Sequence, residues 1–254
     1  FAAQGIEVAA FIPSLHQPRG PLFAGLPTLE AHRALQAQTA AKELAVSGLV
    51  QGIFFGDPLA TIEELQAALA PWKVPSYRAK QIAEWMYQKG ARSFAEMTNL
   101  PKKLREDLSA ALSICCATVK ARQDSMDGKT AKFLLEFADG VAVETVLMRQ
   151  PYGNSICVST QAGCNMGCVF CASTLHGMVR NLTTGAILAQ AVFINDYLRA
   201  EGAKVDTVVI MGSGEPLMNY EAVLQFIRLI HEEYTLYMGY RNMTISTSGI
   251  VPQI

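Results

Sequence analysis

The sequence is poor in charge, since only 17% of its 254 residues are Asp, Glu, Lys or Arg. It lacks any apolar run close to the ~18 uninterrupted residues of a membrane span, and no signal-peptide pattern opens it. These absences predict a protein without a membrane-spanning segment. Half of the residues are apolar, which is enough for a sizeable core in one large or two modest domains. The formal net charge of −1 does not by itself indicate nucleic-acid binding.

The cysteines do not follow the pattern of a disulfide scaffold. Three of the six lie within eight residues, at Cys164, Cys168 and Cys171, with the spacing Cys-x3-Cys-x2-Cys. This clustering is typical of a reduced, metal-binding protein, so we expect a cytoplasmic location. Gly163 and Gly167 supply the backbone freedom that a tight loop around one centre requires.

Thiolates are soft ligands that suit either an iron–sulfur cluster or zinc. A structural zinc site requires a fourth ligand, for which His176 is the nearest candidate. A [4Fe–4S] cluster held by only three cysteines would leave one iron open for a substrate or cofactor. Both readings remain open from the residues alone.

The cysteine spacing, with Phe170 directly before the last cysteine, resembles the signature of radical S-adenosylmethionine (SAM) enzymes. Further segments narrow the resemblance to the RlmN/Cfr family of RNA methyltransferases, over residues 61–254. These segments are Val143–Val146, Cys157–Cys164, Arg180–Thr183, Met211–Asn219 and Ser246–Pro252.

The resemblance implies a [4Fe–4S] cluster on the three cysteines and SAM bound at its open iron. It assigns Gly214, Glu215 and Ser246 to SAM binding, with Glu215 accepting from the methionine ammonium. It also assigns Glu144 as a proton acceptor, and Cys157 to a transient disulfide with a methyl-carrying cysteine. By themselves, Glu215 reads as a first-turn acid of a helix, Glu144 as the exposed face of a strand, and Cys157 as a small buried hydrophobe.

The implied reaction uses two SAM molecules, one to methylate a cysteine and the other to generate the radical that activates this methyl group. The methyl then reaches carbon 2 of an adenine in 23S rRNA, and possibly in tRNA. The implied partners are these RNAs and an electron donor such as flavodoxin or ferredoxin, and we expect a monomer. The open alternatives are a C8-specific Cfr-type enzyme and a non-catalytic iron–sulfur or zinc RNA-binding module.

The pattern predicts an α/β fold in four parts. Residues 1–60 resemble the end of a 6-phospho-muramidase-like TIM barrel, with a strand over 6–12, a helix over 28–47 that breaks near Arg33, and a strand over 52–58 that ends in a turn. Residues 61–116 are expected to form a helical RNA-binding module, with helices that begin near Thr61, Ser76, Ser93 and Leu100. Residues 117–150 are expected to form a small antiparallel sheet, with hairpin turns at Asp127–Lys129 and Ala138–Gly140. Residues 151–254 repeat strand, loop and helix, with Thr183 as the cap of a helix that ends at Arg199, and this repeat predicts a parallel sheet or barrel. The resemblance implies that it forms the first three strands of a partial radical SAM βα barrel. Of these, the third strand should expose an edge.

Charge supports the RNA-binding expectation locally. Between Pro71 and Lys132, twelve Lys or Arg face six Asp or Glu. A basic segment in a near-neutral chain favours phosphate contacts, although a solvated helix face explains the charge equally well. Because the chain starts at Phe1 and stops after what reads as a strand and a turn, we expect a fragment, with the methyl-carrying cysteine beyond Ile254.

Overall fold

The computed structural model describes residues 9–12, 52–55, 62, 65–66, 69–112, 114 and 117–250. The chain divides into two compact units, residues 1–86 with 91–114, and residues 87–90 with 115–254. Among the described residues, no helix is long and apolar enough to cross a membrane. The helix expected over residues 28–47 lies outside the described residues.

The first unit contains a short parallel strand pair and a cluster of helices. Strand β1 (Ala9–Ile12) pairs with β2 (Gly52–Phe55). The helices are the 3₁₀ turn η3 (Ala70–Trp72), α3 (Tyr77–Tyr87), the 3₁₀ turn η4 (Phe94–Glu96) and α4 (Lys102–Ala111). Their order matches the helices predicted for the segment after residue 61.

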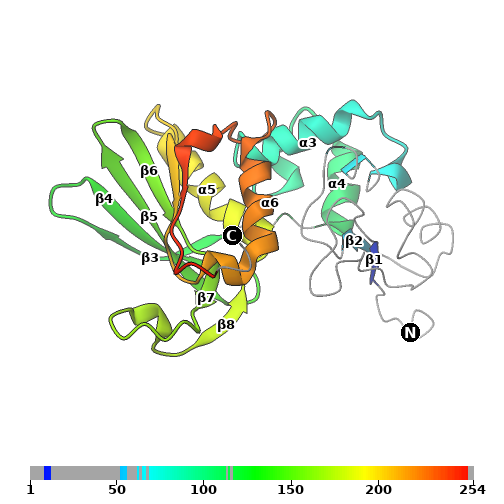
Figure 1. Ribbon diagram of the computed structural model, residues 1–254. Helices are drawn as coiled ribbons and strands as arrows, with labels where there is room; N and C mark the ends of the chain where they lie inside the picture. Colours follow the sequence, from blue (N-terminus) through cyan, green and yellow to red (C-terminus); the bar gives the residue numbers. More distant parts are fainter. Residues whose placement is uncertain are drawn as a thin grey trace. The chain divides into compact units, whose positions relative to one another are not determined.

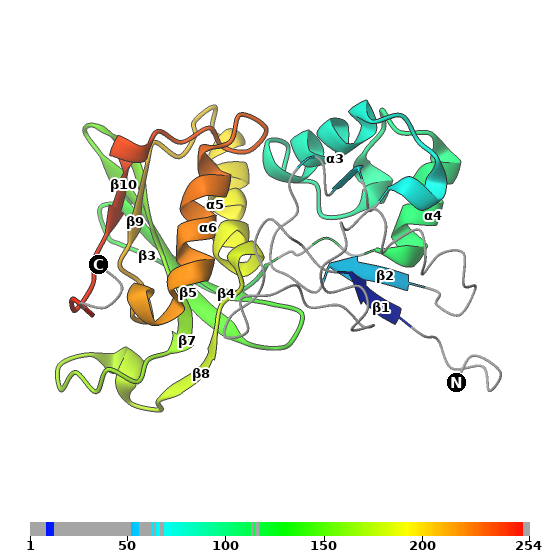
Figure 2. The same ribbon diagram turned by 45° about the vertical axis from the view of Figure 1, so that its right-hand side comes forward.

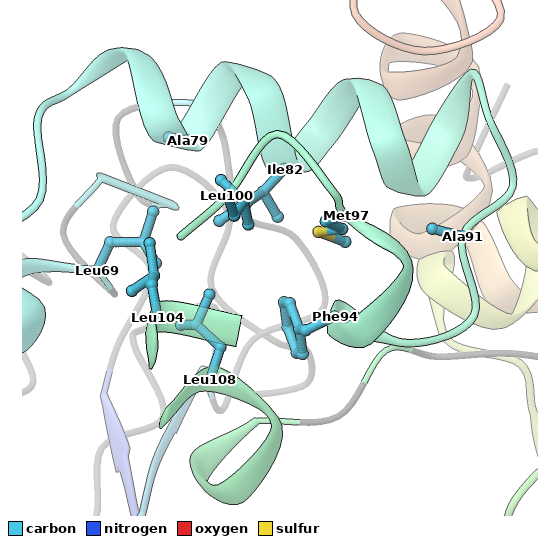
Figure 3. Packing of buried hydrophobic residues seen from close by; sticks show 9 residues of the cluster. All are labelled: Leu69, Ala79, Ile82, Ala91, Phe94, Met97, Leu100, Leu104 and Leu108. Carbon is cyan, nitrogen blue, oxygen red and sulfur yellow. The ribbon is translucent and has the colours of Figure 1, made fainter. Parts of the chain in front are cut away.

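Apolar side chains at helical spacing build the core of this helical cluster (Figure 3). Ile82 of α3, and Leu104 and Leu108 of α4, point into a centre that Phe94 and Met97 fill from the η4 turn. Removing such side chains from water is the main favourable contribution to the stability of so small a unit.

The second unit is a six-stranded mixed sheet covered by two helices (Figures 1 and 2). Its strands run in the order β10, β9, β6, β5, β4, β3. Their bounds are β3 (Thr118–Asp124), β4 (Thr130–Glu136), β5 (Ala142–Gln150), β6 (Gly153–Val158), β9 (Thr207–Ile210) and β10 (Met243–Ile245). The strands β6, β9 and β10 are mutually parallel, whereas β3, β4 and β5 join antiparallel. Strand β10 lies at the edge, as the repeat predicted.

Residues 117–150 do not form a separate sheet, contrary to the expectation from the sequence. The predicted hairpin turns at Asp127–Lys129 and Ala138–Gly140 are present, but β5 also pairs with β6 through the register Val146↔Cys157. The short connection from Gln150 to Gly153 makes this pairing possible, since Gly153 adopts a φ of 129°. The antiparallel strands and the parallel strands therefore share one sheet.

Helices α5 (Thr184–Arg199) and α6 (Tyr220–His231) lie side by side on one face of the sheet (Figures 1 and 2). The predicted cap of α5 is confirmed, because the Thr183 hydroxyl accepts a hydrogen bond from the Ala186 N–H. A two-stranded hairpin, β7 (Gln161–Gly163) and β8 (Met178–Asn181), projects beside the sheet. Three 3₁₀ turns complete the described part of this unit: η5 (Ala172–Thr174), η6 (Pro216–Asn219) and η7 (Tyr240–Asn242).

Candidate cofactor site at the carboxyl edge of the sheet

The predicted cofactor-binding residues follow three parallel strands at the same edge of the sheet. The cysteine loop comes after β6 and β7, Gly214 and Glu215 come after β9, and Ser246 comes after β10. Backbone hydrogen bonds join these segments, from Gly212 N–H to Val158 O at 3.0 Å and from Ser246 N–H to Ile210 O at 3.0 Å. Ligands of open α/β sheets bind at the carboxyl ends of parallel strands, so this edge is the candidate site.

The cysteine loop, residues 164–177, is closed by the β7–β8 hairpin. The Cys164 N–H donates to Gly177 O at 3.2 Å, and Gly163 at the base of the loop has a φ of 77°. A Cβ at position 163 would lie 1.9 Å from Gly177 O, so no other residue fits there without moving the backbone. Further along, the Thr174 hydroxyl bonds to Cys171 O at 2.8 Å and to Cys168 O at 3.2 Å. Glycine at 163 and the Thr174 hydroxyl thus fold the loop back on itself.

All three cysteines of the loop are free thiols. Cys164 is buried, Cys168 and Cys171 are half-buried, and the Met166 N–H lies 3.5 Å from Cys164 Sγ, where it can donate to the sulfur. Hydrogen bonds to sulfur are one means by which proteins tune iron–sulfur clusters. The donor set therefore fits such a cluster in its chemistry.

A zinc ion and an iron–sulfur cluster place different geometric demands on the three thiols. Among the described residues, which include the whole loop, no three His, Cys, Asp or Glu side chains gather closely enough to hold one metal ion. A zinc ion needs each sulfur at about 2.3 Å from one point. A four-iron cluster bonds each thiolate to a different iron, so its ligands stand further apart. His176, the fourth zinc ligand considered from the sequence, is exposed.

The Glu215 carboxylate is buried and fully hydrogen-bonded. Its Oε1 accepts from Leu217 N–H and the Thr247 hydroxyl, and its Oε2 accepts from the N–H and hydroxyl of Ser248. Two carboxylate oxygens offer about four lone-pair positions, so the chain itself fills them all. An ammonium group that binds Glu215, as the family resemblance implies, therefore has to replace one of these donors.

Burial alone would raise the pKa of Glu215. The hydrogen bonds from Ser248, Thr247 and Leu217 act in the opposite direction and together outweigh burial, so the pKa lies below its ordinary value. Glu215 thus stays ionised in neutral solution. As a carboxylate, it ties the segment after β9 to the segment after β10.

Gly212 and Gly214 allow the β9 segment to approach β6 and β7 closely. A Cβ at 212 would lie 2.6 Å from Ser159 Oγ, and one at 214 would lie 2.5 Å from Gln161 Cβ. Gly214 also has a φ of 103°, a conformation that favours glycine. The close approach at Gly214 is thus to Gln161 of the same chain, and the assignment of Gly214 to SAM binding stays a prediction.

Two buried glutamines that sequence reasoning missed hold this edge together. Gln190 of α5 accepts from Thr145 Oγ1 and Ser159 N–H, and donates to the carbonyls of Ser159 and Ala186. Gln161 accepts from Glu215 N–H at 2.9 Å and donates to Asn181 Oδ1 at 2.7 Å. The available signal for Gln190 was a lone amide in an otherwise apolar helical run.

Glu144 and Cys157 lie on neighbouring strands, on the sheet face that points away from α5 and α6. Burial alternates along β4 and β5, and the buried residues face the helices. The pairing of Val146 with Cys157 places Glu144, two residues along β5, diagonally next to Cys157 on the open face. Here the Glu144 carboxylate pairs with Lys132 Nζ at 2.8 Å. Burial raises the pKa of the Cys157 thiol, against a smaller opposite effect of the Met211 N–H.

Three segments of the chain match known protein families. Residues 1–70 match the family described as 6-phospho-N-acetylmuramidase, N-terminal. Residues 60–114 match the ribosomal RNA large subunit methyltransferase N-terminal domain (RlmN), and residues 158–254 match the radical SAM superfamily. The class defined by the fold and site of residues 158–254 is thus the radical SAM superfamily.

Curated relatives narrow this class. The chain is 49% identical over 195 residues to the probable dual-specificity RNA methyltransferase RlmN of Symbiobacterium thermophilum, a match that covers 77% of this chain and 52% of the relative. It is also 49% identical to the RlmN of Geobacillus thermodenitrificans, over 76% of this chain and 53% of the relative. A radical SAM methyltransferase from Sphaerobacter thermophilus superposes with a TM-score of 0.72 at 44% identity, over 76% of this chain and 57% of that chain.

The resemblance to radical SAM methyltransferases of the RlmN type is thereby confirmed. The chain spans about half the length of the curated relatives that it matches.

Proposed function

We propose that the complete gene product is a radical SAM methyltransferase that methylates carbon 2 of an adenine in 23S rRNA and in tRNA. The observation that carries the proposal is the convergence of the cysteine loop, the Gly214–Glu215 segment and Ser246 at one sheet edge, next to the open face that bears Glu144 and Cys157. The relatives named above are described as RNA methyltransferases of dual specificity.

In this proposal Cys164, Cys168 and Cys171 hold a [4Fe–4S] cluster. The cluster and SAM, when bound, supply one-electron cleavage of the sulfonium, chemistry that no side chain provides. The residues that would hold SAM are Gly214, Glu215 through its carboxylate, and Ser246 through its hydroxyl. Two SAM molecules and a methylcysteine belong to the same proposal, with Cys157 as the thiol that pairs transiently with the methyl-carrying cysteine.

Glu144 is the proposed proton acceptor. Its side chain is 57% exposed, on the open sheet face, so a substrate base can reach it. A general base must come within about 3 Å of the proton that it removes, and a half-exposed carboxylate on a strand meets this requirement with little movement.

The proposed RNA partner is supported by the basic residues of the helical unit. A flavodoxin or ferredoxin as electron donor, a monomeric state and the description of the mixed sheet as part of a radical SAM barrel are further parts of the proposal.

The test is anaerobic reconstitution of the complete gene product with iron and sulfide, followed by reduction in the presence of SAM and an rRNA fragment. We expect about four irons per chain, release of 5′-deoxyadenosine and a methyladenine in the RNA. Mass spectrometry separates C2 from C8 methylation, the latter being the alternative activity. A protein that binds zinc, or that binds RNA without releasing 5′-deoxyadenosine, would instead be a non-catalytic binding module.

A further inference from the structure

The open face of the sheet carries two Lys–Glu ion pairs that differ in their distance from the candidate site. Lys132 of β4 lies 2.8 Å from Glu144 of β5, and Lys120 of β3 lies 2.7 Å from Glu136 of β4. The two pairs have the same chemistry, and both join adjacent strands. Only the Lys132–Glu144 pair borders Cys157 and the carboxyl edge of the sheet.

The strand register shows how Lys132 reaches Glu144. Lys132 stands opposite Val146, and Val146 stands opposite Cys157, so these three residues form one row across the open face. Glu144 belongs to the next row, where the Ser159 hydroxyl donates to Glu144 O at 2.7 Å. Lys132 is thus a diagonal neighbour of Glu144, at a separation that a long side chain spans.

Folding stability does little to explain the Lys132–Glu144 ion pair. Its side chains are 39% and 57% exposed, and ion pairs of such exposure contribute little to folding because water screens them and both side chains lose freedom. The pair does, however, fix the direction of the carboxylate. The contact with the Lys132 ammonium holds the Glu144 carboxylate toward β4, on the side of β5 away from Cys157.

Charge adds a second consideration. An RNA strand that approaches this face brings phosphates, and an isolated carboxylate would repel them. Lys132 compensates the Glu144 charge locally, so the carboxylate can sit on a face that is to receive a polyanion.

We propose that Lys132 is a positioning residue that holds the Glu144 carboxylate in place for its reaction with the substrate. The proposal rests on the proposed function, in which Glu144 accepts a proton. Lys132 acts through Glu144 and not by touching the substrate, which makes its role separable from that of a simple phosphate contact.

The experiment compares Lys132→Met with the matched control Lys120→Met in the reconstituted complete gene product. We expect Lys132→Met to lower kcat for RNA methylation at least tenfold, and Lys120→Met to stay within about twofold of the wild type. Both variants should keep melting temperatures within about 3 °C of the wild type, because each loses only one exposed ion pair. Lys132→Arg, which keeps the charge, should recover most of the rate.

A double-mutant cycle tests whether Lys132 acts through Glu144. In a Glu144→Gln background, Lys132→Met should change the residual rate less than twofold, because the group that it positions is gone. If the rate losses caused by the two single substitutions multiply in the double variant, the proposal is overturned. A change in KM alone that disappears at high salt would also overturn it, since this is the behaviour of a phosphate contact.

A readout independent of activity separates this proposal from the proposed function. In protein with ¹³C-labelled glutamate carboxyls, the Glu144 resonance, assigned from Glu144→Gln, should shift in Lys132→Met and stay unchanged in Lys120→Met. An unshifted resonance would overturn the positioning role even in an active enzyme. If the resonance shifts in Lys132→Met but the wild type releases no 5′-deoxyadenosine, the proposed function is refuted, and the positioning role with it.

Discussion

The segment after β9 and the cysteine loop lie in the same unit, but they are stabilised in different ways. Residues 211–219 are held by buried polar contacts to neighbouring segments. Glu215 donates its N–H to Gln161 and accepts from Ser248, and the Asn219 amide donates to two backbone carbonyls. The cysteine loop is anchored by backbone turns and the Thr174 hydroxyl, and it exposes large apolar side chains at Val169, Phe170 and Leu175.

This difference means that contacts within the chain order residues 211–219, whereas a bound ligand has to complete the order of the cysteine loop. At the sheet edge, the Glu215 carboxylate and the Gln161, Gln190 and Asn219 amides find partners within the chain, whereas the buried Thr160 Oγ1 has none among the described residues. In the loop, one free thiol is buried, two are half-buried, and several large apolar side chains are exposed. Loops that bind metal centres commonly gain their final order from the bound group. We therefore expect substitutions at the edge to change folding stability and substitutions at the tip of the loop to change cluster binding.

The largest effect is expected at the base of the loop. Gly163→Ala would place a Cβ 1.9 Å from Gly177 O at a φ of 77°, so the hairpin has to open. We expect a loss of about 4 kcal/mol in the free energy of unfolding, together with loss of iron binding. Urea unfolding and iron content per chain measure the two effects.

The matched control lies four residues away. Gly167 has a φ of 68°, but nothing lies within 4 Å of a Cβ added there. Gly167→Ala should therefore cost only the left-handed conformation, about 1 kcal/mol. Equal destabilisation by the two substitutions would show that backbone conformation and not the contact with Gly177 determines the cost.

The next effect concerns the buried amides. Gln190→Leu leaves the Thr145 hydroxyl and the Ser159 N–H without their partner, so we expect about 3 kcal/mol of destabilisation. Gln225→Leu on α6 is the control, because Gln225 Nε2 is buried without a hydrogen-bond partner among the described residues. Removing that amide should be neutral or stabilising. A stable Gln190→Leu protein would mean that the edge does not depend on its polar network.

The sequence predicts local features of this unit well. The Thr183 cap, the two hairpin turns and the order of strands and helices after residue 151 depend on contacts between residues close in sequence. The periodicity of apolar residues and the positions of glycine carry this information directly.

Contacts between distant residues were not predictable in the same way. The donors that saturate Glu215 come from Thr247 and Ser248, more than thirty residues along the chain, and the partner of Glu144 depends on the register between β4 and β5. A shift of that register by one residue would move Lys132 to the other face of the sheet. The pairing of β5 with β6 was predictable in principle, from the short Pro-Tyr-Gly connection before β6.

An intermediate effect is expected from Glu215→Gln. The substitution weakens charge-assisted hydrogen bonds from Ser248 and Thr247, at a cost of about 2 kcal/mol at neutral pH. Since the folded-state pKa of Glu215 is lowered, its stabilising contribution is complete above the unfolded-state value of about 4.3 and is lost as the pH falls through the lower folded-state value. Chemical unfolding at several pH values should thus show the gap between wild type and variant closing in acid. A gap independent of pH would contradict an ionised Glu215.

The smallest effect concerns the rate of cysteine alkylation, and it compares Cys157 of β6 with the cysteine loop. Cys157 is half-buried, as are Cys168 and Cys171 of the loop, but burial raises the pKa of the Cys157 thiol. Only the thiolate reacts with alkylating reagents, so iodoacetamide should modify Cys157 several-fold more slowly than the loop cysteines in metal-free protein near pH 7.5. Mass spectrometry of the modified peptides over time gives the three rates. The Cys157 rate should continue to increase above pH 8.5, because its thiol titrates later than an ordinary cysteine. If Cys157 instead reacts fastest, a neighbour on the open face activates its sulfur, and burial does not determine its reactivity.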